Sequence, residues 1–165
     1  MGPIERITPG PGQESVWDYP RPPRLERTSQ HIQIILDGVM IAETRRAWRV
    51  LETSHPPVYY IPPDDLALEH FVAVGGSSFC EWKGSASYYD LVVGDRTVPR
   101  AAWTYHHPTP PFAPITDYVA VYPGKMDACY VDGERVQAQP GGFYGGWITS
   151  TIVGPFKGEP GSMGW

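Results

Sequence analysis

The chain has 165 residues, of which 41% are hydrophobic and 13% aromatic, and its formal net charge is -5. A chain of this length can bury enough apolar surface to fold as one domain without a disulfide or a metal ion. The negative charge offers no basic surface to nucleic acid or anionic lipid, so neither is expected as a partner. No stretch has the roughly 18 apolar residues of a membrane span, and the first residues lack a signal-peptide pattern. We therefore expect a soluble, cytoplasmic protein with no membrane partner.

The chain contains two cysteines, Cys80 and Cys129, which are far apart in the sequence and belong to no CxxC pair. This spacing excludes a four-cysteine zinc site and does not favour a disulfide scaffold. We expect reduced, separate thiols, and the sequence predicts no metal site and no cofactor.

Three regions differ in composition. Residues 1–29 are rich in proline and poor in apolar residues, which predicts an arm that wraps a core or stays mobile. Residues 30–139 carry the alternating hydrophobic pattern of a β-domain. Residues 140–165 are rich in glycine, and within this tail we expect one strand, at 147–153.

The first elements of the core are a hairpin and an extended segment. In HIQIILDGVMIA (31–42), apolar residues alternate on both sides of Asp37-Gly38, which is the preferred composition of a two-residue hairpin turn. TRRAWRVLE (44–52) is predicted to be extended, with Arg45, Arg46 and Arg49 on a solvated strand face. PDDLALEH (63–70) is the one segment with helical signals, because a proline and two aspartates occupy its first turn.

Further strands follow at close spacing. Phe79 to Glu81 ends a strand, residues 82–85 turn, and residues 86–93 return, with Tyr88 and Tyr89 on opposite faces. Another turn at 94–97, the segment TDYVAVY and a second Asp-Gly hairpin at Asp132-Gly133 complete the pattern. This succession predicts an all-β fold: a single bent antiparallel sheet with a proline-rich arm and a glycine-rich tail.

The stretch FCEWKGSASYYDL (79–91) combines a thiol, an indole, a lysine and two tyrosines. One interpretation is a hairpin with core aromatics and a solvated turn lysine. The other is a pocket in which an ammonium group binds an anion and aromatic rings supply stacking walls. The residues that would line this pocket are Cys80, Trp82, Lys83, Tyr88, Trp103 and Tyr105.

FCEWKGSASYYD, followed by AAWTYHHP and YVAVY, resembles the family called domain of unknown function 427, sometimes labelled a nucleotidyltransferase family. The resemblance runs from about Gln30 to Val136. The family signature is matched by Cys80, Lys83, Gly84, Ala86, Tyr88, Ala102, Trp103, Tyr105 and Pro108. Family members often have Cys-Pro where this chain has Cys80-Glu81. The resemblance implies a β-tent architecture, similar to that of the zinc-carrying Mss4-like domains, without their paired CxxC motifs.

Three specific chemistries can be compared with the residues. Nucleotidyltransferases hold Mg²⁺ with two carboxylates one residue apart on a strand, but the partner position of Asp90 is Val92. His106 or His107 with a cysteine could contribute to a mixed zinc site, and Cys80 with one of these histidines could form a thiolate pair. The residues favour none of the three.

The sequence therefore predicts a domain that binds a small anionic or aromatic metabolite, and it leaves open whether the domain is an enzyme. The alternative is a non-catalytic protein-interaction module in which the arm and the tail dock a partner. The expected partner is a small-molecule ligand, and a homodimer is left open.

Overall fold

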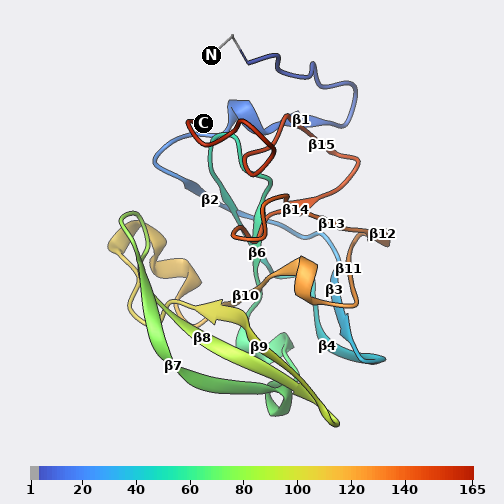
Figure 1. Cartoon of the computed structure of the whole chain (residues 1–165), viewed down its shortest axis with the longest axis vertical. Helices are drawn as coiled ribbons and strands as arrows, with labels where there is room; N and C mark the ends of the chain where they lie inside the picture. Colours follow the sequence, from blue (N-terminus) through green and yellow to red (C-terminus); the bar gives the residue numbers. More distant parts are fainter. Residues whose placement is uncertain (1–3) are drawn as a thin grey trace.

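The computed structural model describes residues 4–165, which form fifteen short strands and five short 3₁₀ helices (Figure 1). The all-β class is confirmed. The strands are distributed over several sheets, and an isolated antiparallel bridge between Ile61 and Val119 links two of them. Within residues 4–165, no helix is long and apolar enough to cross a membrane.

The longest strands form an antiparallel sheet in the order β10-β9-β8-β7. Its members are β7 (Phe71–Cys80), β8 (Gly84–Val93), β9 (Arg96–Thr104) and β10 (Val119–Val121). On β8, Leu91 and Val93 are buried in one hydrophobic cluster, whereas Tyr88 packs against another. This arrangement confirms the predicted alternation of faces, because successive side chains of a strand point to opposite sides.

A second antiparallel sheet has the order β12-β11-β3-β4, and a third has the order β2-β5-β6. The second contains β3 (Ile32–Leu36), β4 (Val39–Thr44), β11 (Ala128–Val131) and β12 (Glu134–Arg135). The third contains β2 (Arg24–Arg27), β5 (Trp48–Leu51) and β6 (Val58–Tyr60). Two small pairs complete the fold: β1 (Glu14–Ser15) with β15 (Ile152–Val153), and β13 (Gln137–Ala138) with β14 (Trp147–Ile148).

Both predicted Asp-Gly turns are confirmed. Asp37 and Gly38 have φ angles of 50° and 76°, and Asp132 and Gly133 have φ angles of 50° and 82°. Positive φ at both central residues defines the hairpin turn that matches the twist of the flanking strands.

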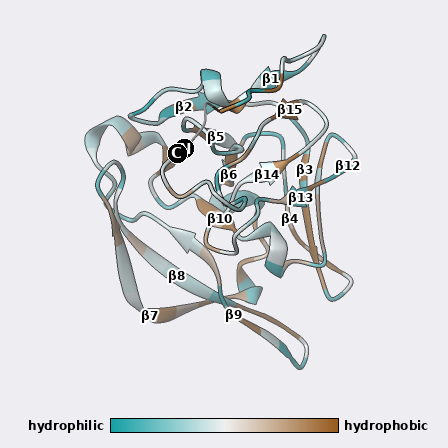
Figure 2. Ribbon diagram, turned by 45° about the horizontal axis from the view of Figure 1, so that its top comes forward, coloured by the Kyte–Doolittle hydropathy of each residue, from teal (hydrophilic) through white to brown (hydrophobic). Residues whose placement is uncertain are grey.

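The core lies on both sides of the β7–β10 sheet. One cluster fills the space between this sheet and the β3–β4–β11 sheet, and it includes the fully buried side chains of Ile32, Ile34 and Leu91. A second cluster lies between the opposite side of the β7–β10 sheet and strands β5 and β6. It includes Trp103 and Tyr105. Figure 2 shows hydrophobic residues concentrated along central strands such as β3 and β10.

Two predicted elements are wrong. Residues 63–70 do not form one helix but two 3₁₀ helices, η2 (Pro63–Asp65) and η3 (Leu68–His70), because Leu66 between them forms a bridge with Ala42. Residues 147–153 are not one strand, because a turn separates β14 from β15. The other 3₁₀ helices are η1 (Val16–Asp18), η4 (Pro110–Ile115) and η5 (Pro123–Lys125).

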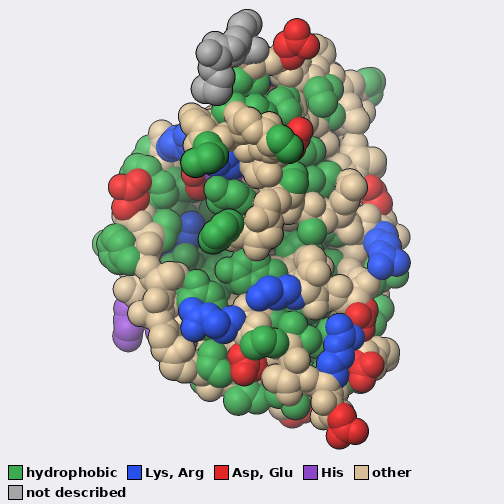
Figure 3. Space-filling view, in the orientation of Figure 1, with side chains coloured by type: hydrophobic (Ala, Val, Ile, Leu, Met, Phe, Trp, Pro, Cys, Tyr) green, Lys and Arg blue, Asp and Glu red, His purple; other side chains and the backbone are tan. Residues whose placement is uncertain are grey.

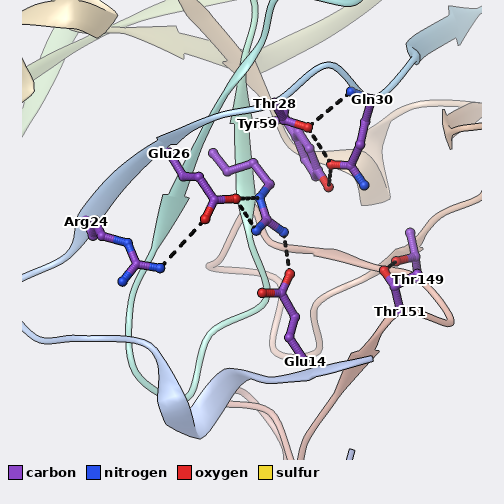
Figure 4. A network of polar contacts seen from close by, with 9 residues as sticks. Glu14, Arg24, Glu26, Thr28, Gln30, Tyr59, Thr149 and Thr151 are labelled. Carbon is purple, nitrogen blue, oxygen red and sulfur yellow. Dashed lines mark hydrogen bonds and ion pairs between the residues drawn. The ribbon is translucent and has the colours of Figure 1, made fainter. Parts of the chain in front are cut away.

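The expected solvated arginine face is also wrong at one position. Arg49 has only 8% of its side chain exposed and binds two carboxylates, those of Glu14 and Glu26, which are labelled in Figure 4. Its Nη1 donates to Glu14 at 2.6 Å, and its Nε donates to Glu26 at 3.1 Å. Both carboxylates come from residues 1–29. Because β1 and β2 pair with β15 and β5, the described part of this arm, residues 4–29, wraps the core, and residues 1–3 lie outside the described part.

Candidate functional site

A cleft of about 700 Å³ opens on the side of the β7–β10 sheet that faces β5 and β6. Figure 3 shows this face of the molecule as hollowed, with hydrophobic side chains around the hollow and a cationic group within it. Three parts of the chain line the cleft: the β7–β8 hairpin with its neighbour β9 and with Tyr122 after β10, the segment from β5 to β6, and residues 139–145. A volume of this size is typical of sites for small molecules.

The structure brings all six sequence-predicted residues to this cleft: Cys80, Trp82, Lys83, Tyr88, Trp103 and Tyr105. Trp103 and Tyr105 are almost buried, with 8% and 5% of their surface exposed, and they form the floor. The other four are partly exposed and belong to the hairpin. The thirteen-residue stretch is therefore both a hairpin and one wall of a cleft.

The turn that carries Lys83 is held in place from behind. Gly84 has a φ of 104°, and a Cβ at this position would lie 3.3 Å from the carbonyl oxygen of His107, so the turn requires glycine. Thr109 donates its backbone N–H to the Lys83 carbonyl at 3.0 Å and its hydroxyl to the Trp82 carbonyl. These contacts fix the direction in which the Lys83 side chain leaves the turn.

The Lys83 ammonium lies over aromatic rings. Its Nζ is 5.9 Å from the ring centre of Tyr105 and 6.0 Å from that of Phe112. Among residues 4–165, no carboxylate forms an ion pair with it. The ring faces attract the ammonium through their negative π-surfaces but provide no full negative charge.

Aromatic contacts make the floor of the cleft rigid. Trp103 donates its Nε1–H to the Tyr60 hydroxyl at 3.0 Å, and its ring centre lies 4.6 Å from that of Tyr122. Burial raises the pKa of Tyr60 and of Tyr105 well above the ordinary value and raises that of Tyr122 to about 12. All three phenols are therefore neutral at physiological pH and add no negative charge beside Lys83.

Tyr88 is held at the edge of the cleft. Its hydroxyl lies 2.7 Å from Ser78 Oγ, and the Arg100 guanidinium carbon is 4.1 Å from its ring centre. Both contacts fix the orientation of the ring.

The wall opposite the hairpin was not predicted from the sequence. It includes Glu52 and His55, which lie between β5 and β6, together with Gln139, which directly precedes the tail, and Tyr144 of the tail. The ring centres of Tyr144 and His55 are 5.1 Å apart in an edge-on contact. Val58 and Tyr60 of β6 also line the cleft. The sequence signal for these two residues is the period of two in VYY, which places them on the same strand face.

The tail approaches the floor so closely that glycine is required. A Cβ built on Gly145 would collide with the Trp103 ring, and one on Gly146 would collide with Gln139. Behind them, Trp147 is fully buried and donates its backbone N–H to Pro57 at 2.8 Å. Residues 139–147 therefore close one side of the cleft.

In the described part of the chain, the side chains that the three alternative chemistries need do not lie together. Asp90 accepts the Arg100 backbone N–H at 2.8 Å, and His106 Nδ1 is 2.7 Å from Asp117. Neither His106 nor His107 lines the cleft with Cys80. Residues 4–165 contain no group of three or more His, Cys, Asp or Glu side chains that could hold a metal ion.

Comparison with protein families gives one match. Residues 24–132 match the profile of the family described as domain of unknown function DUF427. Because the match spans more than half of the chain, the protein belongs to this family. The match includes the hairpin and the floor of the cleft, whereas the tail lies outside it. No curated protein matches the chain.

Proposed function

We propose that the cleft binds a small molecule that has a planar, aromatic body and an anionic group. The observation that carries the proposal is the Lys83 ammonium, which faces ring surfaces in a cleft of about 700 Å³ and has no anionic partner within the described residues 4–165. A bound anion would accept a charge-assisted hydrogen bond from this ammonium. The ring faces of the aromatic walls would stack on the body of the ligand.

Phenylacetate is a suitable probe because it combines one ring with one carboxylate, and phenethylamine has the same ring with the opposite charge. Binding is followed by NMR through the indole N–H signals of the tryptophans that line the cleft. The protein should bind phenylacetate and not phenethylamine. In Lys83→Met the affinity for phenylacetate should fall about 10- to 100-fold, since a charge-assisted hydrogen bond is worth roughly 1.5 to 3 kcal/mol.

Lys125→Met is the matched control, because it removes the same charge from an exposed lysine that does not line the cleft. It should retain parental affinity. Both variants should melt near the parental temperature, because an exposed or half-exposed lysine contributes little to folding. Parental affinity for phenylacetate in Lys83→Met, or no binding to the parent protein, would overturn the proposal.

A protein-interaction module remains the second candidate, and strand β7 favours it. β7 forms one edge of its sheet and, among the described residues, pairs with β8 alone. Its ten residues include no charged side chain, and Phe79 is 76% exposed. Such an edge can pair with a second copy of the chain, since uncharged strands allow two molecules of net charge -5 to approach. Sedimentation equilibrium would detect this dimer.

For either function, the cytoplasm remains the expected location.

A further inference from the structure

The amide of Gln139 has one allowed orientation. Its Oε1 accepts the Gly146 backbone N–H at 3.2 Å, and its Nε2 donates to the Lys157 carbonyl at 2.9 Å. Because a backbone N–H only donates and a carbonyl only accepts, exchanging the two ends of the amide would lose both bonds. Gln139 has 4% of its surface exposed, so neither bond can be replaced by water at low cost.

This orientation determines the tautomer of His55. The second N–H of Gln139 points at His55 Nδ1, 3.0 Å away, so Nδ1 must be the acceptor. Burial, together with the charges of Arg21, Lys157 and Lys83, lowers the pKa of His55 to about 4. At physiological pH the imidazole is therefore neutral, and its one proton is on Nε2.

The proton on Nε2 has an open position beside it. Nε2 makes no hydrogen bond to any residue in 4–165, and the nearest carboxylate oxygen, Glu52 Oε2, is 3.7 Å away, too far for a hydrogen bond. Glu52 also forms an ion pair with Arg21 at 3.4 Å. His55 and Glu52 both line the cleft. A hydrogen-bond donor and an acceptor thus lie side by side at the end formed by the β5–β6 segment and the tail.

We propose that His55 and Glu52 form a second recognition point of the cleft, at which one hydroxyl group of the ligand is bound. The hydroxyl oxygen accepts from His55 Nε2–H, and the hydroxyl proton is donated to Glu52. This inference rests on the proposed function and narrows the ligand class to hydroxylated aromatic anions: the anionic group binds Lys83, and the hydroxyl binds His55 and Glu52. Gln139 is a positioning residue, because it acts on the ligand through the His55 tautomer.

The test compares two probes that differ by one hydroxyl, phenylacetate and para-hydroxyphenylacetate, in the full chain. The hydroxylated probe should bind the parent protein about tenfold more tightly, which corresponds to about 1.4 kcal/mol for the additional hydrogen bonds. His55→Asn keeps an acceptor close to the position of Nδ1 for Gln139 but removes Nε2. In this variant the two probes should bind equally.

His55→Gln is the conservative variant, because its longer side chain places an amide N–H close to the position of Nε2. It should recover part of the preference for the hydroxylated probe, which a purely structural role of His55 would not produce. Nitrogen NMR of the parent protein should show His55 as the Nε2–H tautomer at neutral pH.

The outcomes separate this inference from the proposed function. If phenylacetate binds but the hydroxyl adds no affinity, or adds the same affinity in His55→Asn, the second recognition point is refuted and the function stands. A protonated Nδ1 in the parent protein also refutes it. If neither probe binds, the proposed function and this inference fail together.

Discussion

Arg49 shows what one buried cation does for the fold. Its guanidinium binds Glu14 of β1 and Glu26 of β2, so it connects the proline-rich arm to β5. Without the guanidinium, Glu14 loses this partner and Glu26 keeps the weaker pair with Arg24 at 3.7 Å, and each carboxylate is 41% exposed and remains partly solvated. Arg49→Met should therefore lower the free energy of unfolding by about 1 to 3 kcal/mol, less than for a fully buried pair.

Arg46→Met is the control for this prediction. Arg46 belongs to the same arginine run and pairs with Asp65 at 2.8 Å, but 57% of its side chain is exposed. Its loss should cost no more than about 1 kcal/mol, as for other surface ion pairs. Urea unfolding measures both variants. Equal costs for the two substitutions would mean that the buried contacts of Arg49 do not stabilise the attachment of the arm.

The sequence does not distinguish these two arginines, and the reason is physical. The run RRAWR predicts extended chain, and its charge alone predicts a solvated face for all three arginines. Which face is buried depends on residues 14 and 26, and nothing local predicts that they pack there. The same limit applies to His55, because its environment is created by Gln139, which is distant in the sequence.

At the scale of single elements, the turns were the most predictable features. Asp-Gly specifies a hairpin because both residues tolerate positive φ at low cost, and both instances are confirmed. The helix expected at 63–70 failed because a capping pattern acts locally, whereas the bridge between Leu66 and Ala42 is tertiary. Short strands such as β14 and β15 lack the length that would make their periodicity visible.

The turn at Gly38 provides a test at this scale. Gly38 has a φ of 76°, and a Cβ added there would have no atom within 4 Å, so a larger side chain would meet strain without a collision. Gly38→Val should lower the free energy of unfolding by on the order of 1 kcal/mol or more, because a β-branched residue is disfavoured at positive φ. The control is Gly75→Val, at a position that is equally open but lacks a positive φ. Equal melting temperatures for parent and Gly38→Val would show that the turn conformation is not required.

At the scale of the whole molecule, the cleft is assembled from three parts of the chain. The hairpin wall was predictable, because Cys80, Trp82, Lys83 and Tyr88 lie within nine residues and belong to one hairpin. The wall of Glu52 and His55 and the wall from the tail were not, since neither contains a motif that points to the hairpin. Sequence patterns describe the walls of such a site one at a time, whereas tertiary packing determines which walls face one another.

Contact between the tail and the floor predicts that binding and stability are coupled through Gly145. The Gly145→Ala methyl group would collide with the Trp103 ring, so residues 139–147 would have to move away from the floor or the ring would have to move. We expect a loss of about 1 to 3 kcal/mol in the free energy of unfolding, as for other overpacked sites, together with weaker phenylacetate binding. Gly124→Ala is the control, because its methyl group would make an ordinary contact at 3.4 Å with Ala138. Urea unfolding and the NMR titration provide the two measurements. If Gly145→Ala keeps parental stability and affinity, the tail does not pack on Trp103 in solution, and the cleft is formed by the hairpin and the β5–β6 segment alone.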